Sequence, residues 1–162
     1  MKDRWGVPAA MFGDAPEDFY SLVGRVALIS ALLEDRLHVL YCALARAPQD
    51  CLAGEPGRLL IRKCRQHTDA VPDERRDDAE AFLDAADAAL LLRNEVVHSL
   101  WPFTGRDKTH GWRDIPRNRR DSAEIVQWTS LDAGQLPELV VDLVGLVERC
   151  RHVEQSVTRH AA

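Results

Sequence analysis

Three polar side chains with types suited to acid–base and anion-binding chemistry stand close together in this chain. Arg93, Asn94 and His98 lie in the stretch LLRNEVVHSLW, which covers residues 91 to 101 and is followed by Pro102. Histidine titrates near neutral pH, and arginine stays charged while its planar fork offers two donors to phosphate oxygens. The same residues stand where an apolar helix should be finishing its core contacts. The stretch is therefore either a chemical site or a helix end.

Helix geometry separates these residues into two directions. Asn94 and His98 share a face, whereas Arg93 and His98 diverge by roughly 140° around the axis. Arginine is long enough to converge on a ligand beside His98 from that angle, which suits a groove between helices or subunits. Alternatively, Arg93 and His98 contact the terminal carbonyls and the negative helix end. From spacing alone the helix-end role is favoured, since Arg62 and His67 repeat the same spacing without supporting context.

The elements that must position this stretch follow from apolar residues recurring every three or four positions. Residues 16 to 47 predict a long amphipathic helix, with Asp14 as its N-cap, Pro16 in its first turn and Pro48 as its stop. A linker rich in glycine and proline leads to a shorter helix predicted over residues 58 to 70.

A third helix is predicted to open after Pro72 and to run to about Trp101, so its last turns carry the polar stretch. Glu95 is expected on its surface. A fourth helix is predicted over residues 133 to 160. Between them, residues 102 to 131 contain HGWRDIPR and EIVQWTS, which can pair as a short β-hairpin around the basic run RNRRD.

Four helices with short connections predict an all-α, antiparallel four-helix bundle, with the hairpin inserted between the third and fourth helices. A length of 162 residues favours one domain, residues 1 to 162. Four aromatic residues in or beside the insertion are predicted to pin the hairpin to the bundle, in preference to stacking on bases: Trp101, Phe103, Trp112 and Trp128.

Composition narrows the classes of function. The net charge of −5 argues against a protein that coats nucleic acid through bulk electrostatics, although the insertion is locally basic. No leader or membrane-spanning stretch stands out, so a cytoplasmic protein is expected. The four cysteines are expected to be buried thiols: Cys42, Cys51, Cys64 and Cys150. A zinc site at Cys51, Cys64 and His67 is disfavoured, because such sites have two closely spaced ligand pairs. No metal or cofactor is expected.

The stretch LLRNEVVHSLW resembles the signature of the HEPN superfamily, small helical bundles in which an arginine, a polar residue and, a few positions later, a histidine form the motif. Here these are Arg93, Asn94 and His98. The long helix FYSLVGRVALISALLEDRLHVLYCALA is similar to the opening helix of bacterial members of that group. By architecture the resemblance covers most of the chain, and the hairpin is an addition to the basic fold.

The resemblance implies a homodimer whose paired motif helices form a metal-independent ribonuclease site, often in toxin–antitoxin or defence systems, with an antitoxin protein as a candidate partner. RNA carries its own nucleophile, the 2'-hydroxyl, so His98 would exchange protons, Arg93 would stabilise the phosphate and Asn94 would support them. RNA-binding residues are expected in the insertion: Arg113, Arg117, Arg119 and Arg120. Some members are inactive and serve as RNA-binding or protein-interaction modules, and the motif does not separate the two.

Overall fold

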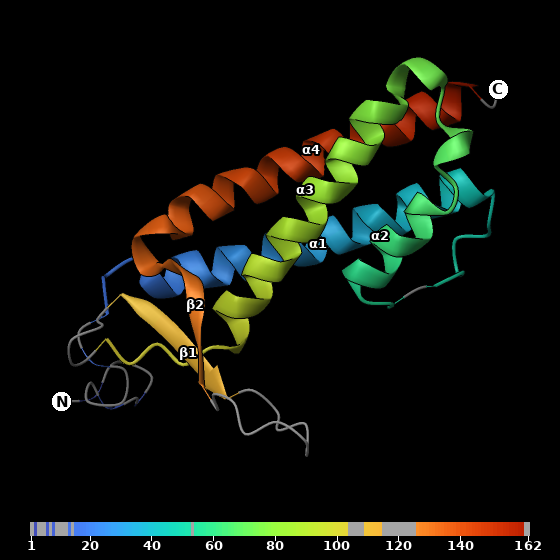
Figure 1. Cartoon of the computed structure of the whole chain (residues 1–162). Helices are drawn as coiled ribbons and strands as arrows, with labels where there is room; N and C mark the ends of the chain where they lie inside the picture. The colour runs from blue at the N-terminus through green and yellow to red at the C-terminus, as the bar shows by residue number, and fades with distance from the viewer. Residues whose placement is uncertain are drawn as a thin grey trace, which may run out of the picture.

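The computed structural model describes residues 2, 6, 8, 13, 15–52, 54–103, 109–114 and 126–160. Its elements are helices α1 (Phe19–Ala45), α2 (Gly57–Arg65), η2 (Thr68–Ala70) and α3 (Asp73–His98), strands β1 (His110–Asp114) and β2 (Val126–Asp132), and helices η3 (Ala133–Gln135) and α4 (Leu136–His160) (Figure 1). The prediction of four main helices with an antiparallel hairpin between the third and fourth is confirmed. Within these residues, no helix combines the length and apolarity needed to cross a membrane.

The helices α1 and α2 run in the same direction. The first residue of α2, Gly57, donates its N–H to Glu34 in the middle of α1, and His67, just beyond the end of α2, packs edge-on against Tyr41 near the end of α1. The connection between them therefore returns along α1 before α2 starts. Helix α4 also runs with α1, and α3 alone runs the opposite way (Figure 1). The predicted antiparallel arrangement therefore holds from α2 to α3 and from α3 to α4, and it is wrong for α1 and α2.

Helix α1 starts three residues later than its apolar pattern predicts. Asp18 holds the N-cap position without a side-chain cap, and Pro16 lies outside the helix, where its carbonyl accepts a hydrogen bond from the N–H of Phe19 (3.0 Å). The predicted N-cap, Asp14, lies outside the described residues. The helix ends at Ala45, because the following residue, Arg46, takes a left-handed conformation with φ of 51°.

The helix predicted over residues 58 to 70 is two short helices. Hydrogen bonds from Gln66 to Lys63 and from His67 to Cys64 span three residues instead of four, which tightens the last turn and ends α2. The chain then makes the single turn η2 before α3 begins. Periodicity did not reveal this break, because Cys64 and Val71 lie seven residues apart on either side of it, which is the spacing of two helical turns.

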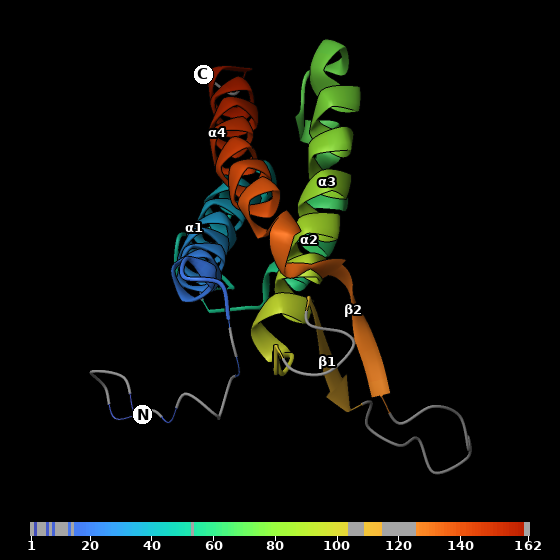
Figure 2. The ribbon, with the colours of Figure 1, turned by 90° about the vertical axis from the view of Figure 1, so that its left-hand side faces the viewer.

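The core lies between α1, α3 and α4, with α2 covering part of one side (Figure 2). Burial follows the predicted stripes closely on α1 and α4. The largest fully buried side chains are Phe82, Leu33, Leu37, Leu40, Leu60, Ile61, Leu83, Leu90, Leu136, Leu143, Val26 and Val71.

Three of the four cysteines are buried thiols, as expected, and Cys51 is partly exposed. Cys64 packs beneath α1, and burial raises the pKa of its thiol from 9.0 to about 12. Burial also raises the pKa of Cys150 and of Cys42. These thiols therefore stay protonated and serve as small core groups.

The predicted aromatic core of the insertion is only half present. Trp101 and Phe103 are buried and pack on Phe19, with ring centroids 5.4 and 4.6 Å from it, so they attach the chain after α3 to the start of α1. Trp112 and Trp128 instead pair across the two strands, and Trp128 is 51% exposed. The prediction that all four rings pin the hairpin is wrong for Trp128, because its strand projects beyond the bundle (Figure 2).

Candidate functional site

Arg93 faces the interior of the bundle. It follows Ala86 and Leu90, both buried, at the spacing of one helix face, so its side chain points toward α1. Its Nη2 lies 2.5 Å from Oε1 of Glu34 on α1, and the two side chains are 18% and 30% exposed. Arg93 therefore forms a part-buried ion pair between helices, and the expectation that it interacts with terminal carbonyls is wrong.

Arg93 also orients its neighbour in the motif. Its Nη1 donates a hydrogen bond to Oδ1 of Asn94 (2.9 Å). Oδ1 accepts from the guanidinium, and the two donors on the amide nitrogen of Asn94 have no partner among the described residues. The same Oε1 of Glu34 that pairs with Arg93 accepts the N–H of Gly57 (3.3 Å). One polar chain thus runs from α2 through α1 to the motif on α3.

His98 stands apart from this chain. It is the last residue of α3, its side chain is exposed, and it lies one helical turn after Asn94 on the same face. Within the described residues it makes no hydrogen bond or ion pair. A single chain therefore brings Arg93 and Asn94 together, and it leaves His98 open to solvent.

A tryptophan, and not a residue of the motif, forms a hydrogen bond to a backbone carbonyl at the end of α3. The Nε1 of Trp101 donates to the carbonyl oxygen of Val96 (3.0 Å), one of the carbonyls that a helix end leaves without a partner. Leu100 then exchanges two backbone hydrogen bonds with Trp112 of β1, at 2.8 and 2.9 Å. The helix end is consequently fixed to the hairpin two residues after His98.

Glu95, which the sequence predicts on the surface, connects α3 to the hairpin. Its Oε2 accepts hydrogen bonds from the backbone N–H and the hydroxyl of Ser130 on β2, at 2.6 and 2.8 Å. The sequence offered no signal for this pair, because the two residues are far apart in the chain and both types are common on surfaces.

Among the described residues, α2 leaves the part of α3 around the motif uncovered, because α2 begins beside Leu90 and runs away from the motif. Gly57 starts α2 directly against Leu90, where an added Cβ would stand 2.6 Å from Cδ1 of that leucine. Beyond this point α2 no longer covers α3. Leu91, Asn94 and His98 form what we call the motif face, and Leu91 is exposed. Val97 continues the interior stripe of α3, yet it is 39% exposed.

The basic insertion is described only in part. Arg113 on β1 donates from Nε and Nη2 to Oε1 of Gln127 on β2, at 3.3 and 3.0 Å, and it has no carboxylate partner among the described residues. The other three predicted RNA-binding residues lie outside the described part of the chain: Arg117, Arg119 and Arg120.

The remaining sequence candidates do not form sites. Within the described ranges no three His, Cys, Asp or Glu side chains converge as metal ligands would, and this includes Cys51, Cys64 and His67. The repeated spacing of Arg62 and His67 does not fall on one helix, because α2 ends at Arg65.

Comparison with known proteins gives no relative. No family model, no curated protein and no solved structure matches the chain. The chemistry of the region therefore has to be argued from its own geometry.

Proposed function

We propose that this protein is a homodimeric, HEPN-like RNA endonuclease that cleaves without a metal ion. The observation that carries the proposal is the motif face: the amide donors of Asn94 and the ring of His98 lie one turn apart on an open part of α3. Arg93 stands beside them as a fixed positive charge. Transfer of the RNA phosphoryl group to the internal 2'-hydroxyl requires an acid–base group for the proton. It also requires a neutral donor and a cation for the charge on the phosphate.

In the proposed reaction, His98 removes the proton of the RNA 2'-hydroxyl, and the 2'-oxygen attacks the adjacent phosphorus. The bond from phosphorus to the 5'-oxygen breaks, and a second histidine, supplied by the other copy of the chain, protonates that oxygen. Asn94 donates to a non-bridging phosphate oxygen, and Arg93 lowers the cost of the negative charge that develops there. The products are a 2',3'-cyclic phosphate and a free 5'-hydroxyl.

The two-fold arrangement follows from what one chain lacks. Arg93 diverges from His98 around the helix and is held toward α1, so a single motif does not surround a phosphate. Exposed apolar side chains beside the motif give a second copy something to bury, namely Leu91, Val97 and Leu100. A symmetric dimer would then place two histidines in one groove.

A second candidate is a catalytically silent module that binds RNA or a partner protein, including an antitoxin, through the same groove. One observation favours it: the charge of Arg93 is already compensated by Glu34 in a part-buried ion pair. An arginine held in this way stabilises the fold whether or not a substrate is present. Cleavage assays separate the two candidates.

The test is incubation of the purified protein with defined RNAs. His98→Ala should abolish cleavage and leave helical content intact, because the His98 side chain makes no hydrogen bond or ion pair within the described structure. Arg62→Ala and His67→Ala repeat the same residue types at the same spacing and serve as the matched control. Equal loss in the control variants would point to misfolding or a contaminating nuclease. An inactive wild-type protein that still binds RNA or a partner would establish the silent module.

A further inference from the structure

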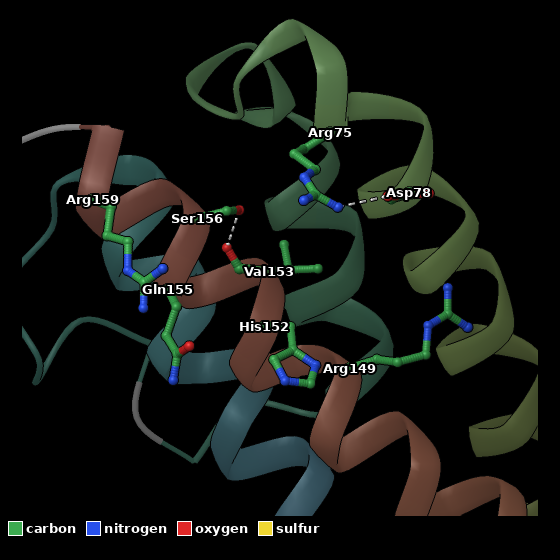
Figure 3. Close-up of a pocket in the computed structure, with 8 residues that line it drawn as sticks. All are labelled: Arg75, Asp78, Arg149, His152, Val153, Gln155, Ser156 and Arg159. Carbon is green, nitrogen blue, oxygen red and sulfur yellow. Dashed lines mark hydrogen bonds and ion pairs between the residues drawn. The ribbon is translucent and has the colours of Figure 1, made fainter.

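At the end of the bundle farthest from His98, residues of α3 and α4 line a half-open cavity of about 500 Å³ (Figure 3). Half of the residues that line it are basic, namely Arg75, Arg149, His152 and Arg159, and the others are Asp78, Val153, Gln155 and Ser156. We call this cavity the arginine cleft. Arg75 and His98 lie on the same helix, 23 residues apart, which corresponds to about 35 Å. The cleft is therefore separate from the motif face.

The charges in the arginine cleft are only partly compensated. Arg75 pairs with Asp78 at 3.5 Å, the longest but one of the ion pairs in the described structure. Arg149 and Arg159 have no carboxylate within 4.0 Å among the described residues. The cleft thus holds a local excess of at least two positive charges in a chain with a net charge of −5.

A second arginine-lined hollow on the same molecule gives an internal comparison. Along α2, Arg58 pairs with Asp87 at 2.8 Å and Arg65 pairs with Asp84 at 2.5 Å, so two of its three arginines are neutralised by α3. The remaining arginine there is Arg62. In this second hollow two arginines are thus matched with an acid on the facing helix, whereas Arg149 and Arg159 in the arginine cleft have no such partner among the described residues.

Packing holds one of the uncompensated guanidinium groups in place. The Cζ of Arg149 lies 5.8 Å from the ring centroid of Phe82, a fully buried residue of α3. This contact orients the guanidinium without neutralising it. Compensation of the helix dipole does not account for its position, since Arg149 lies eleven residues before the end of α4 and the dipole acts within the last turn. Arg159, by contrast, lies in the last turn of α4, where the helix dipole favours a positive charge.

We propose that the arginine cleft binds a small polyphosphate anion, either free pyrophosphate or the phosphate chain of a nucleotide. Guanidinium groups from two facing helices can each bind phosphate oxygens with two donors, and His152 of α4 also lines the cleft (Figure 3). The volume lies within the range of small-molecule sites, about 300 to 1,000 Å³. Such a ligand would join the two helix ends that Figure 2 shows standing apart.

The test is calorimetric titration of the full chain at physiological ionic strength with sodium pyrophosphate, ATP and adenosine. Pyrophosphate and ATP should bind at one site, and adenosine should not bind. Tighter binding of ATP than of pyrophosphate supports the nucleotide form, and equal binding supports pyrophosphate as the whole ligand. No binding of either anion at millimolar concentration would overturn the proposal.

Matched variants locate the site. The double variant Arg149→Ser with Arg159→Ser should weaken pyrophosphate binding by at least about tenfold, because it removes two charged donors. The control, Arg25→Ser with Arg62→Ser, removes the same charge from exposed arginines on α1 and α2 and should change binding by less than about twofold. Equal weakening in both variants would mean bulk attraction and would overturn the assignment. An RNA oligomer that binds through Arg149 and is not displaced by pyrophosphate would do the same.

Discussion

Glu34 and Arg93 are 59 residues apart in the chain, and their carboxylate and guanidinium meet at 2.5 Å between α1 and α3. This pair fixes the direction of Arg93, and through it the amide of Asn94. The motif is therefore positioned by α1 as much as by its own helix. It follows that residues outside the motif control its geometry.

Glu34→Ala should destabilise the fold, because it leaves a part-buried guanidinium without its partner. We expect the free energy of unfolding in urea to fall by about 1 to 2 kcal/mol, less than for a fully buried pair. Asp84→Ala is the matched control, since its ion pair with Arg65 has the same 2.5 Å distance but exposed side chains, at 41% and 76%. That variant should lose less than about 1 kcal/mol. Equal losses of unfolding free energy in the two variants would show that the burial of Arg93 does not strengthen its ion pair.

Glu95→Ala should loosen the hairpin without unfolding the bundle. The change removes the acceptor of two hydrogen bonds from Ser130, one of them from its backbone N–H. Amide exchange at Ser130 should accelerate, with a loss of about 0.5 to 1.5 kcal/mol in stability. Glu148→Ala, on the exposed side of α4, should change neither quantity. Unaltered exchange at Ser130 would contradict the assigned anchor.

The proposed homodimer has a direct measurement. Light scattering at micromolar concentration should give a mass near twice the 18.2 kDa of the chain. Replacing Val97, which is 39% exposed beside the motif, with Asp should shift the mass toward the monomer, because a charge would be buried in the interface. Val141→Asp, on the exposed side of α4, is the control. A monomeric wild-type chain would contradict the proposal that two copies of the motif form one site.

The proposed cleavage chemistry predicts its own products. Because the motif supplies His98, Asn94 and Arg93 and no group of carboxylates, RNA cleavage should continue in EDTA. It should yield a 2',3'-cyclic phosphate and a 5'-hydroxyl, identified by mass spectrometry. RNA with a 2'-O-methyl group at the cut position should resist cleavage, since its nucleophile is blocked. Products ending in a 3'-hydroxyl, or activity that magnesium alone restores, would defeat this mechanism.

The buried thiols predict a loss of stability at alkaline pH. The unfolded chain releases the Cys64 proton near pH 9.0, whereas burial holds the folded pKa at about 12. The contribution is complete below pH 9 and falls between pH 9 and 12, because the unfolded state binds fewer protons there. Urea unfolding should show a flatter decline for Cys64→Ala, although its stability at neutral pH is lower. Leu83→Ala, which also truncates a buried side chain but removes no titratable group, should keep the wild-type slope.

Sequence periodicity located every main helix, because burial of one face imposes a repeat that can be read without coordinates. The hairpin was predicted from the segments HGWRDIPR and EIVQWTS, in which the alternation is weak. Periodicity could not give the direction of α2, since an apolar repeat is the same whether a helix runs parallel or antiparallel to its neighbour. The break between Arg65 and Thr68 was also missed, because it depends on which backbone carbonyl each N–H selects.

The candidate site was predicted in its residues but not in their contacts. A signal for the Glu34 pair was present: position 93 continues the apolar line of Ala86 and Leu90, and an arginine on such a line needs an acidic partner inside the bundle. Which acid it meets was not available from the chain, because several carboxylates lie on helices that could face it. The exposure of His98 likewise depends on where α2 begins.

The two backbone hydrogen bonds between Leu100 and Trp112 make the length of the chain after α3 critical. Side chains alternate between the two sides of a strand. Deleting Ser99 would therefore turn the side chain of the residue that pairs with Trp112 to the opposite side. Gly111, packed where a Cβ would stand 2.7 Å from the ring of Trp101, shows how little space that side offers. Homologues that share this hairpin should therefore vary in length elsewhere, and the two residues after His98 should show neither insertions nor deletions.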